Sequence, residues 1–162
     1  MNKLVLYLVV VTVILMAFLS GYTGLFVGPG GSEDMQTFTD SGATAAYVDG
    51  KPVIRLYSTT WCPHCNWVGP TFDSVVKEYV AEGKIIAYHW ELDTGDNTLT
   101  DEVESSVPLS EMQVYEQFNP RGTIPTFVFG GKYYRIGTGY EKQGDLLAEE
   151  REFRAVIDSL LK

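Results

Sequence analysis

"TTWCPHCNWVGP", residues 59–70, holds the only two cysteines of the chain, Cys62 and Cys65, with two residues between them. Such a pair serves as a structural disulfide, as part of a metal site or as a dithiol that reacts. The chain has 162 residues, 45% of them apolar, which is enough for one domain with its own hydrophobic core. A disulfide across so short a loop would stabilise that core little. The pair is therefore not expected to be a structural cross-link.

A zinc site is also disfavoured. No second cysteine pair is present, so a zinc ion would need His64 and His89, the only histidines. Since His64 stands between the two cysteines, its ligation geometry would compete with theirs. We expect no metal and no other cofactor, only a redox-active disulfide formed by Cys62 and Cys65.

The N-terminal residues have the composition of a membrane segment or an export signal. Lys3 is the only charged residue before Glu33, and the uncharged stretch 4–27 is long enough to cross a bilayer as a helix. Residues 17–19 match a signal-peptidase site poorly, so an uncleaved anchor over residues 1–27 is favoured above a cleaved signal, after which the protein would be secreted. The position of Lys3 predicts a cytoplasmic N-terminus and a domain on the other side of the membrane.

Residues 28–34, "GPGGSED", are rich in glycine and predict a flexible linker. The folded domain is then expected over residues 35–162. The net charge of −9 and the pI near 4.6 argue against nucleic-acid binding, because phosphates would repel such a surface.

The hydrophobic pattern of residues 35–162 predicts alternating strands and helices. Runs of β-branched and aromatic residues predict four strands, at 53–57, 84–93, 123–129 and 132–137. Turns are expected at Asp49-Gly50 and at Gly130-Gly131. Four helices are expected: a short one over 41–48, one from the cysteines to Gly83, one from Ser110 with Gln113 completing a capping box, and one from Asp145 to the C-terminus. This order predicts an α/β domain with a mixed sheet.

Two apolar patterns predict which helical residues face the core. After the cysteines these are Phe72, Val75, Val76, Tyr79 and Val80. In the last helix they are Leu146, Leu147, Phe153, Val156, Ile157, Leu160 and Leu161.

The cysteines are predicted to lie where a strand gives way to the N-terminus of a helix. The helix dipole and the unpaired N–H groups there favour a thiolate at Cys62. Cys65, one turn later, is expected to be less exposed and to resolve mixed disulfides formed at Cys62. Pro63 suits the first helical position, and His64 brings an imidazole near the Cys62 sulfur. Both favour the reduced form, which makes the disulfide a stronger oxidant.

The motif W-C-P-H-C followed by Pro70 resembles the active-site helix of the thioredoxin superfamily. "RGTIPTFVFGG", residues 121–131, resembles the family's segment with a cis proline, here Pro125. The resemblance covers residues 35–162 and implies a thioredoxin-like mixed sheet flanked by helices. It also implies that Trp61, Ile124 and Pro125 contact the substrate beside Cys62.

Two departures from the family pattern affect the expected chemistry. The family has a buried aspartate six residues before the first cysteine, where this chain has Leu56. His89 lies near the position of a family lysine beside the resolving thiol, so proton transfer by His89 is one prediction and a surface histidine without this role is the other. The chain also has an acidic insertion around 93–110, interpreted either as a partner-selecting surface or, with more weight, as a solvated loop.

These features predict a membrane-tethered thiol-disulfide oxidoreductase outside the cytoplasm, acting on protein thiols and disulfides as an oxidase or isomerase. A separate redox partner would recycle its dithiol. The alternatives are a tethered reductase, for example in cytochrome maturation, and a non-enzymatic protein that uses the fold to bind a partner or an iron-sulfur cluster.

Overall fold

The computed structural model describes residues 35–162. The anchor and the linker predicted for residues 1–34 lie outside the described residues and stay predictions. Among the helices of the described part, none is long and apolar enough to cross a membrane.

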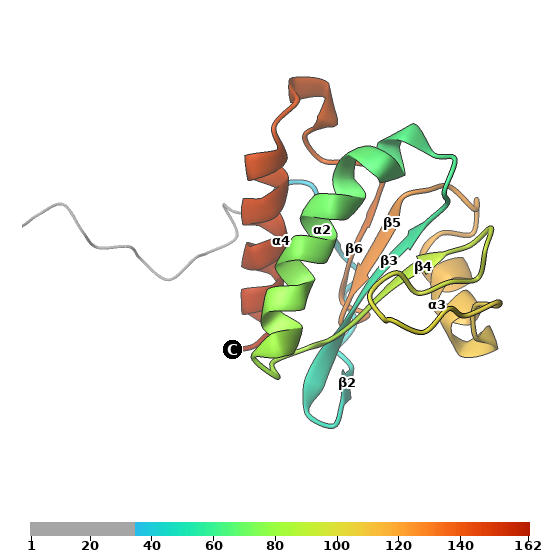
Figure 1. The fold of residues 1–162 in the computed structure, drawn as a ribbon. Coiled ribbons are helices and arrows are strands. Elements are labelled where there is room, and N and C mark those ends of the chain that lie inside the picture. The colour runs from blue at the N-terminus through green and yellow to red at the C-terminus, as the bar shows by residue number, and fades with distance from the viewer. Residues whose placement is uncertain (1–34) are drawn as a thin grey trace, which may run out of the picture. The chain divides into compact units, whose positions relative to one another are not determined.

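A central sheet carries helices on both faces (Figure 1). Helices α2 (Pro63–Ala81) and α4 (Leu146–Leu160) pack side by side on one face, and α3 (Leu109–Phe118) lies on the other. The strands are β1 (Thr39–Asp40), β2 (Tyr47–Val48), β3 (Lys51–Ser58), β4 (Ile86–Glu91), β5 (Thr126–Phe129) and β6 (Tyr133–Ile136). The predicted α/β fold, with a mixed sheet flanked by helices, is thereby confirmed for residues 35–162.

Strand β3 is the centre of the sheet. It pairs in parallel with β4 and antiparallel with β5, and β6 and β1 continue the sheet beyond β5. The register places Leu56 of β3 beside His89 of β4. Residues of β3 two apart point to one face, so Leu56 and Ser58 share the face covered by α2. This register decides which side chains lie behind the active-site helix.

The predicted helix after the cysteines is α2. Cys62 caps it, Pro63 is its first residue, and the chain leaves it at Gly83, whose φ of +69° is the left-handed conformation that glycine adopts most readily. The predicted apolar positions Phe72, Val75, Val76 and Tyr79 are buried, whereas Val80 is 46% exposed. Four aromatic rings form the centre of this core, those of Phe72, Phe127, Phe129 and Phe153.

The helix predicted for residues 41–48 is wrong. Residues Tyr47–Val48 instead form β2, joined to β3 by a two-residue turn at Asp49-Gly50. Both turn residues have positive φ, 51° and 74°, which suits the twist of a tight hairpin. The Tyr47 hydroxyl donates to the carbonyl of Leu160 at 2.9 Å and fixes this hairpin to the end of α4. Tyr47 and Val48 therefore pair with β3, and the composition of this segment does not predict that pairing.

The capping box predicted at Ser110 is also wrong. Helix α3 begins at Leu109, after Pro108, and no side chain caps its N-terminus. Glu111 faces inward and pairs with Arg55 of β3, with 2.6 Å between Oε2 and Nε. This pair holds α3 on its face of the sheet, over a second cluster made of Tyr57, Trp90, Tyr115 and Val128.

Helix α4 differs from its predicted apolar stripe at both ends. Leu146, Leu147 and Leu161 are 38%, 66% and 37% exposed, while Glu149 and Glu152 are fully buried within the stripe. Asp145 caps the helix by accepting from the N–H of Ala148. The two buried glutamates belong to an ion network described below.

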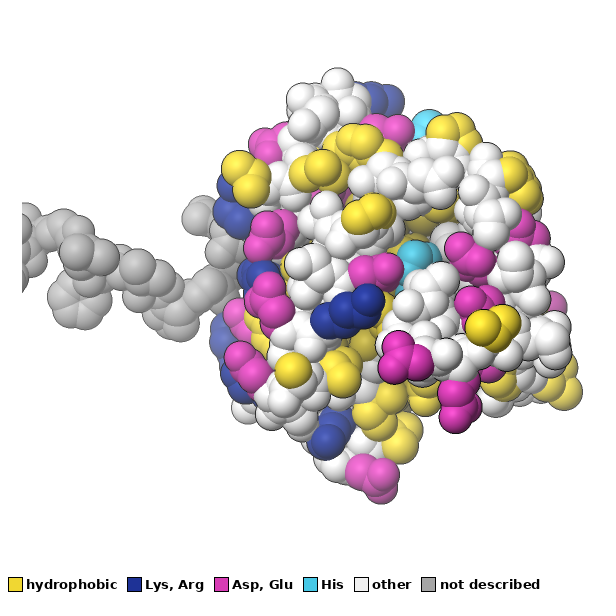
Figure 2. Space-filling view, viewed as in Figure 1, with side chains coloured by type: hydrophobic (Ala, Val, Ile, Leu, Met, Phe, Trp, Pro, Cys, Tyr) yellow, Lys and Arg dark blue, Asp and Glu magenta, His cyan; other side chains and the backbone are white. Residues whose placement is uncertain are grey.

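The acidic insertion is folded onto the free edge of β4. The backbone of Glu91 donates to Asp96, and Trp90 and Asn97 form an isolated bridge. The Asn97 side chain accepts from the N–H of His89, and Glu104 accepts from the N–H of Asn97. Figure 2 shows acidic side chains gathered over this side without basic neighbours, whereas both signs alternate over α2 and α4. The insertion therefore protects a sheet edge and exposes its charge to solvent.

Candidate active site

Both cysteines lie at the N-terminus of α2, as the sequence predicts. Cys62 is the N-cap residue, and its Sγ accepts from the N–H of Cys65 at 3.3 Å. The cysteines are free thiols in this structure. A sulfur in this position meets the positive end of the helix dipole and an unpaired N–H group, both of which favour negative charge on it.

The predicted difference in exposure between the cysteines is absent. Cys62 is 3% exposed and Cys65 is 4% exposed. They differ in environment instead: burial, together with the hydrogen bond to Cys62, raises the pKa of Cys65 to about 12. Cys65 is thus held as a protonated thiol beside Cys62, which suits a resolving residue.

The His64 ring is hydrogen-bonded to a residue far along the chain. Its Nδ1 donates to Glu141 Oε2 at 2.7 Å, and the Thr138 hydroxyl donates to the same oxygen at 2.9 Å. The hydrogen bonds to His64 and Thr138 lower the pKa of Glu141 against the opposing effect of burial. The predicted role of His64 beside the Cys62 sulfur stays a prediction, and the structure adds Glu141 as a hydrogen-bond partner of its ring.

A groove runs beside the dithiol, and we call it the Pro125 groove. It is lined by His64, Ile124, Pro125, Gly137, Thr138, Glu141 and Lys142 and encloses about 410 Å³. The Ile124–Pro125 peptide bond is cis, as the resemblance implies. Trp61, directly before Cys62, is 70% exposed. The predicted substrate-contacting residues Ile124 and Pro125 therefore share one groove with His64, with an exposed indole beside Cys62.

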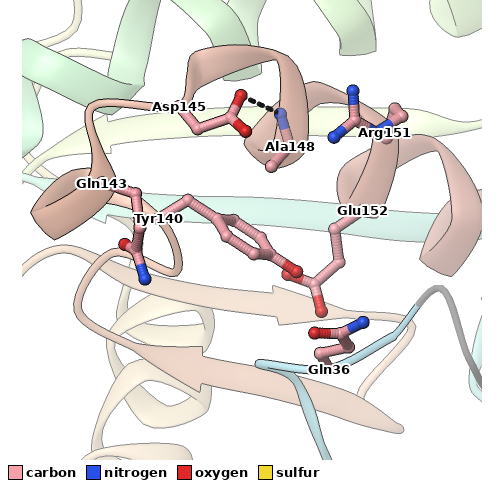
Figure 3. Close-up of a pocket in the computed structure, with 7 residues that line it drawn as sticks. All are labelled: Gln36, Tyr140, Gln143, Asp145, Ala148, Arg151 and Glu152. Atoms are coloured by element: carbon pink, nitrogen blue, oxygen red, sulfur yellow. Dashed lines mark hydrogen bonds between the residues drawn. The ribbon is translucent and has the colours of Figure 1, made fainter.

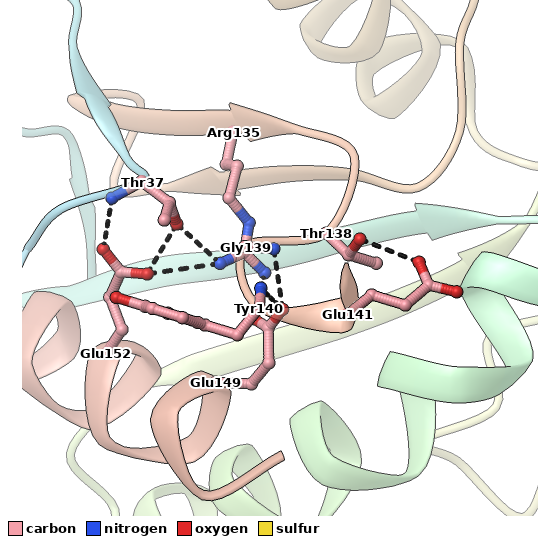
Figure 4. A network of polar contacts seen from close by, with 8 residues as sticks. All are labelled: Thr37, Arg135, Thr138, Gly139, Tyr140, Glu141, Glu149 and Glu152. Atoms are coloured by element: carbon pink, nitrogen blue, oxygen red, sulfur yellow. Dashed lines mark hydrogen bonds and ion pairs between the residues drawn. The ribbon is translucent and has the colours of Figure 1, made fainter. Parts of the chain in front are cut away.

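A buried ion network supports the segment that carries Thr138 and Glu141 (Figure 4). Arg135 of β6 pairs with Glu149 at 2.7 Å and with Glu152 at 3.4 Å. Glu149 also accepts from the N–H groups of Gly139 and Tyr140, at 2.6 and 2.8 Å. The backbone between Gly137 and Glu141 is thus fixed from the protein interior.

The N-terminal part of the described chain joins the same network. Glu152 accepts from the N–H and the hydroxyl of Thr37, and Arg135 donates to that hydroxyl at 2.9 Å. The Arg135 guanidinium also lies over the rings of Phe38, Phe127 and Phe153. One buried cation therefore links residues 37–38, β6 and α4.

A second pocket lies at the N-terminal end of α4 and is unrelated to the dithiol (Figure 3). It is lined by Gln36, Tyr140, Gln143, Asp145, Ala148, Arg151 and Glu152. None of the residues predicted to act on the substrate lines it.

His89 is buried beneath α2. Its Nδ1 bonds to Asp73 Oδ1 at 2.7 Å, and its Nε2 bonds to Ser58 Oγ at 2.8 Å. It shares a polar pocket with Cys65, which agrees with the predicted position beside the resolving thiol. The alternative of a surface histidine is wrong, because His89 is only 7% exposed.

The acidic insertion contacts the active-site loop through one residue. Asp93 accepts from both the N–H and the hydroxyl of Thr60, two residues before Cys62. These bonds lower the pKa of Asp93. The insertion is therefore not only a solvated loop, since its first residue fixes the loop that precedes the dithiol.

Asp73, Thr138 and Glu141 lie around the dithiol and were not predicted from the sequence. Cys65, Gly69 and Asp73 are spaced four residues apart, so they share a face of α2, and this spacing would have indicated Asp73. Glu141 and Thr138 are far from the dithiol in sequence. No local pattern links them to His64.

Comparisons with known proteins give limited likenesses. No family model matches the chain. Bloodstream-specific protein 2 of Trypanosoma brucei brucei is 42% identical over 48 residues, which are 30% of this chain and 9% of that protein. The chain thus spans only a small part of this relative.

Among solved structures, a thioredoxin of Fasciola hepatica is 18% identical with a TM-score of 0.40, covering 68% of this chain and 81% of its own. StoA of Bacillus subtilis is 19% identical with a TM-score of 0.38, over 62% and 82% of the two chains. A structure described as a putative thiol:disulfide interchange protein DsbE, from Chlorobium tepidum, is 15% identical with a TM-score of 0.40, over 75% and 99%. All three TM-scores are below 0.5.

Proposed function

We propose that this protein is a thiol-disulfide oxidoreductase that exchanges disulfides with protein substrates through Cys62 and Cys65. The observation that carries the proposal is the dithiol itself. One sulfur caps α2 and receives an N–H hydrogen bond, and the other is a buried thiol with a raised pKa one turn later. Two thiols with such different environments suit the separate roles of nucleophile and resolving group.

In the oxidising direction, a substrate thiolate attacks Cys62 of the Cys62–Cys65 disulfide, and Cys65 leaves with the electron pair and takes up a proton. A second substrate thiolate then attacks the substrate sulfur of the mixed disulfide. Cys62 leaves as a thiolate, the substrate gains a disulfide, and the protein keeps the two electrons. The reducing direction is the reverse of these steps.

The substrate segment is proposed to lie in the Pro125 groove, with Trp61 contacting it beside Cys62. Ile124, Pro125 and His64 all line this groove. An extended polypeptide is the proposed ligand, because the exposed indole of Trp61 offers an apolar contact beside Cys62 in addition to the groove.

Oxidase or isomerase activity is proposed above reductase activity because of the Pro63-His64 dipeptide. The His64 ring is also bonded to Glu141 Oε2 at 2.7 Å, so a carboxylate lies beside this dipeptide. Iron-sulfur binding through Cys62 is disfavoured, because the described part of the chain holds no group of three metal-ligating side chains. No prosthetic group other than the dithiol is proposed, and a separate redox partner would recycle it.

We also propose that residues 1–27 anchor the protein in a membrane, with the N-terminus in the cytoplasm and residues 35–162 outside. The support is the uncharged length of 4–27 and the position of Lys3. Nucleic acid is not proposed as a partner, given the net charge of −9.

The proposal is tested by mixing the oxidised full-length protein, in detergent, with a reduced unfolded polypeptide that carries two cysteines. Alkylation and mass spectrometry follow the disulfide as it forms in the polypeptide. We expect transfer by the wild type and none by Cys62→Ser. Cys65→Ser, mixed with the polypeptide in its disulfide form, should accumulate a mixed disulfide at Cys62. A wild type that neither transfers a disulfide nor forms a mixed one would contradict the proposal.

A further inference from the structure

A polar pocket of about 210 Å³ lies behind the resolving thiol, and we call it the Cys65 pocket. Residues of α2, β3, β4 and the acidic insertion line it, among them Ser58, Thr59, Cys65, Asp73, His89 and Thr98. Its titratable groups are Cys65 and Asp73 from α2, and His89 and Glu91 from β4. The pocket shares no lining residue with the Pro125 groove.

A chain of hydrogen bonds crosses this pocket. The Asp73 carboxylate only accepts, so Nδ1 of His89 carries a hydrogen and Nε2 of the neutral ring is its accepting nitrogen. The Ser58 hydroxyl then donates to Nε2. His89 therefore presents its accepting nitrogen to Ser58, while the Asp73 carboxylate holds the opposite nitrogen.

Two hydroxyls in the pocket have no protein partner. Thr59 Oγ1 and Thr98 Oγ1 are both buried and make no hydrogen bond within the described part of the chain. Buried hydroxyls are nearly always hydrogen-bonded, and a polar space of this size has room for several water molecules. The pocket is thus suited to hold water that joins Cys65 to the Ser58–His89 pair.

The chemistry of Cys65 requires a proton acceptor. With a pKa of about 12, only about one thiol in 100,000 is ionised at pH 7. The position next to His89 in the sheet is Leu56, which is fully buried and cannot accept a proton. His89 is the basic group that the sheet register places on this face instead.

We propose that His89, oriented by Asp73, is the proton acceptor and donor for Cys65, acting through Ser58 and water in the Cys65 pocket. This inference rests on the proposed function, because it assigns a role within the same exchange reaction.

Resolution of the mixed disulfide begins with a proton transfer from Cys65. With a substrate disulfide-linked to Cys62, the Cys65 thiol passes its proton toward Nε2 of His89, which becomes an imidazolium paired with Asp73. The Cys65 thiolate attacks the Cys62 sulfur, the Cys62–Cys65 bond forms, and the substrate sulfur leaves with the electron pair of the broken bond. In the oxidising direction Cys65 is the leaving group, and the imidazolium returns the proton to it.

Asp73 also connects the Ser58–His89 pair to solvent. Its side chain is 22% exposed, whereas that of His89 is 9% exposed. Gly69, between Cys65 and Asp73 on α2, allows the ring to lie close to the helix, because a Cβ there would be 3.3 Å from Cε1 of His89. The proton taken from Cys65 therefore has a path outward along one face of α2.

The test is single-turnover kinetics of the reduced full-length protein with oxidised glutathione. Acid quenching and mass spectrometry separate the glutathione adduct at Cys62 from the Cys62–Cys65 disulfide, so that adduct formation and its resolution are timed separately. In His89→Asn we expect resolution at pH 7 to slow by about 100-fold, the usual size of a general-base contribution. Formation of the adduct should be unchanged.

The pH dependence distinguishes proton transfer from a structural role. Resolution by the wild type should become independent of pH where the acceptor is already unprotonated. In His89→Asn it should keep rising by about tenfold per pH unit, because hydroxide must remove the proton. Asp73→Asn should slow resolution by a smaller factor, since the neutral amide orients the ring without stabilising its charge.

Asp158→Asn is the matched control, because Asp158 also accepts from a ring-bearing side chain, Tyr79, but in the contact between α2 and α4. It should leave both steps unchanged. The proposal is overturned if His89→Asn resolves the adduct at the wild-type rate, or if it slows both steps equally with an unchanged pH profile. Failure of the proposed function itself would look different, because the wild type would then form no adduct or no internal disulfide.

Discussion

Replacing Glu149 by glutamine tests whether the buried ion network holds the fold and the active-site loop together. Glu149 is fully buried and pairs with Arg135 at 2.7 Å. The amide retains an oxygen that can accept from the N–H groups of Gly139 and Tyr140. What it removes is the charge opposite Arg135, whose pKa burial already lowers against the opposing effect of the carboxylates.

Removing one partner of a buried ion pair costs about 3–5 kcal/mol, because the remaining charge is left without compensation. Glu152 stays near Arg135 at 3.4 Å, so we expect the lower end, about 3 kcal/mol. With a urea m-value of about 2 kcal/mol/M, the midpoint of unfolding should fall by about 1.5 M. For a domain of this size, the Tm should fall by about 10 °C.

The assay is urea unfolding followed by circular dichroism and tryptophan fluorescence, with Glu150→Gln as the control. Glu150 is the neighbouring residue, but its pair with Arg154 is partly exposed. Exposed helix pairs contribute about 0.3–0.5 kcal/mol, so the control should lose at most about 0.5 kcal/mol. Equal losses in the two variants, or a loss below about 1 kcal/mol in Glu149→Gln, would refute the reasoning.

Three further changes test the supports of the dithiol. Gly139→Ala should cost about 1–3 kcal/mol, because its methyl group would lie 2.7 Å from the guanidinium of the buried network; thermal unfolding would measure this, and an unchanged Tm would contradict it. Glu141→Gln removes a negative charge beside His64 and should make the dithiol more oxidising in a glutathione titration, with an unchanged potential as the contrary result. Because the pKa of Glu141 is lowered in the folded protein, its carboxylate contributes to the free energy of unfolding above its unfolded pKa. This contribution is lost as the pH falls below about 4, where the stabilities of wild type and variant should converge. Asp93→Ala should speed backbone hydrogen exchange at Thr60, and equal exchange in both proteins would show that Asp93 does not fix that loop.

The local patterns of the sequence predicted most of the fold. The strands around Ile54, Trp90 and Phe127 and the helix after Cys62 were expected because each combines a clear apolar period with turn residues at its ends. The helix expected before Asp49 failed because small apolar residues have no strong period. Tyr47 belongs to a strand because it pairs with Pro52, a contact that only the folded chain provides.

The reactive residues of the site were predicted from the sequence, but the residues that hold them in place were not. Cys62, Cys65 and Pro125 belong to short motifs, whereas the partners of His64 and His89 come from distant segments. Glu149 was not among the residues predicted to face the core, since a charged side chain is rarely fully buried. Its burial depends on Arg135, and such pairs across the fold leave no trace in the local sequence.

We propose above that Cys62 and Cys65 form a reversible redox couple that exchanges with other thiols. Its most direct test is an equilibrium titration of the full-length protein in detergent against glutathione buffers, with the two redox states counted by alkylation and mass spectrometry.

We expect a single two-electron transition that is abolished in Cys65→Ser, at a potential above that of a typical reducing thioredoxin, about −270 mV. A transition below that value would still support the exchange reaction, but the protein would then act as a reductase. A dithiol that stays unchanged over the whole range of buffers would contradict the account.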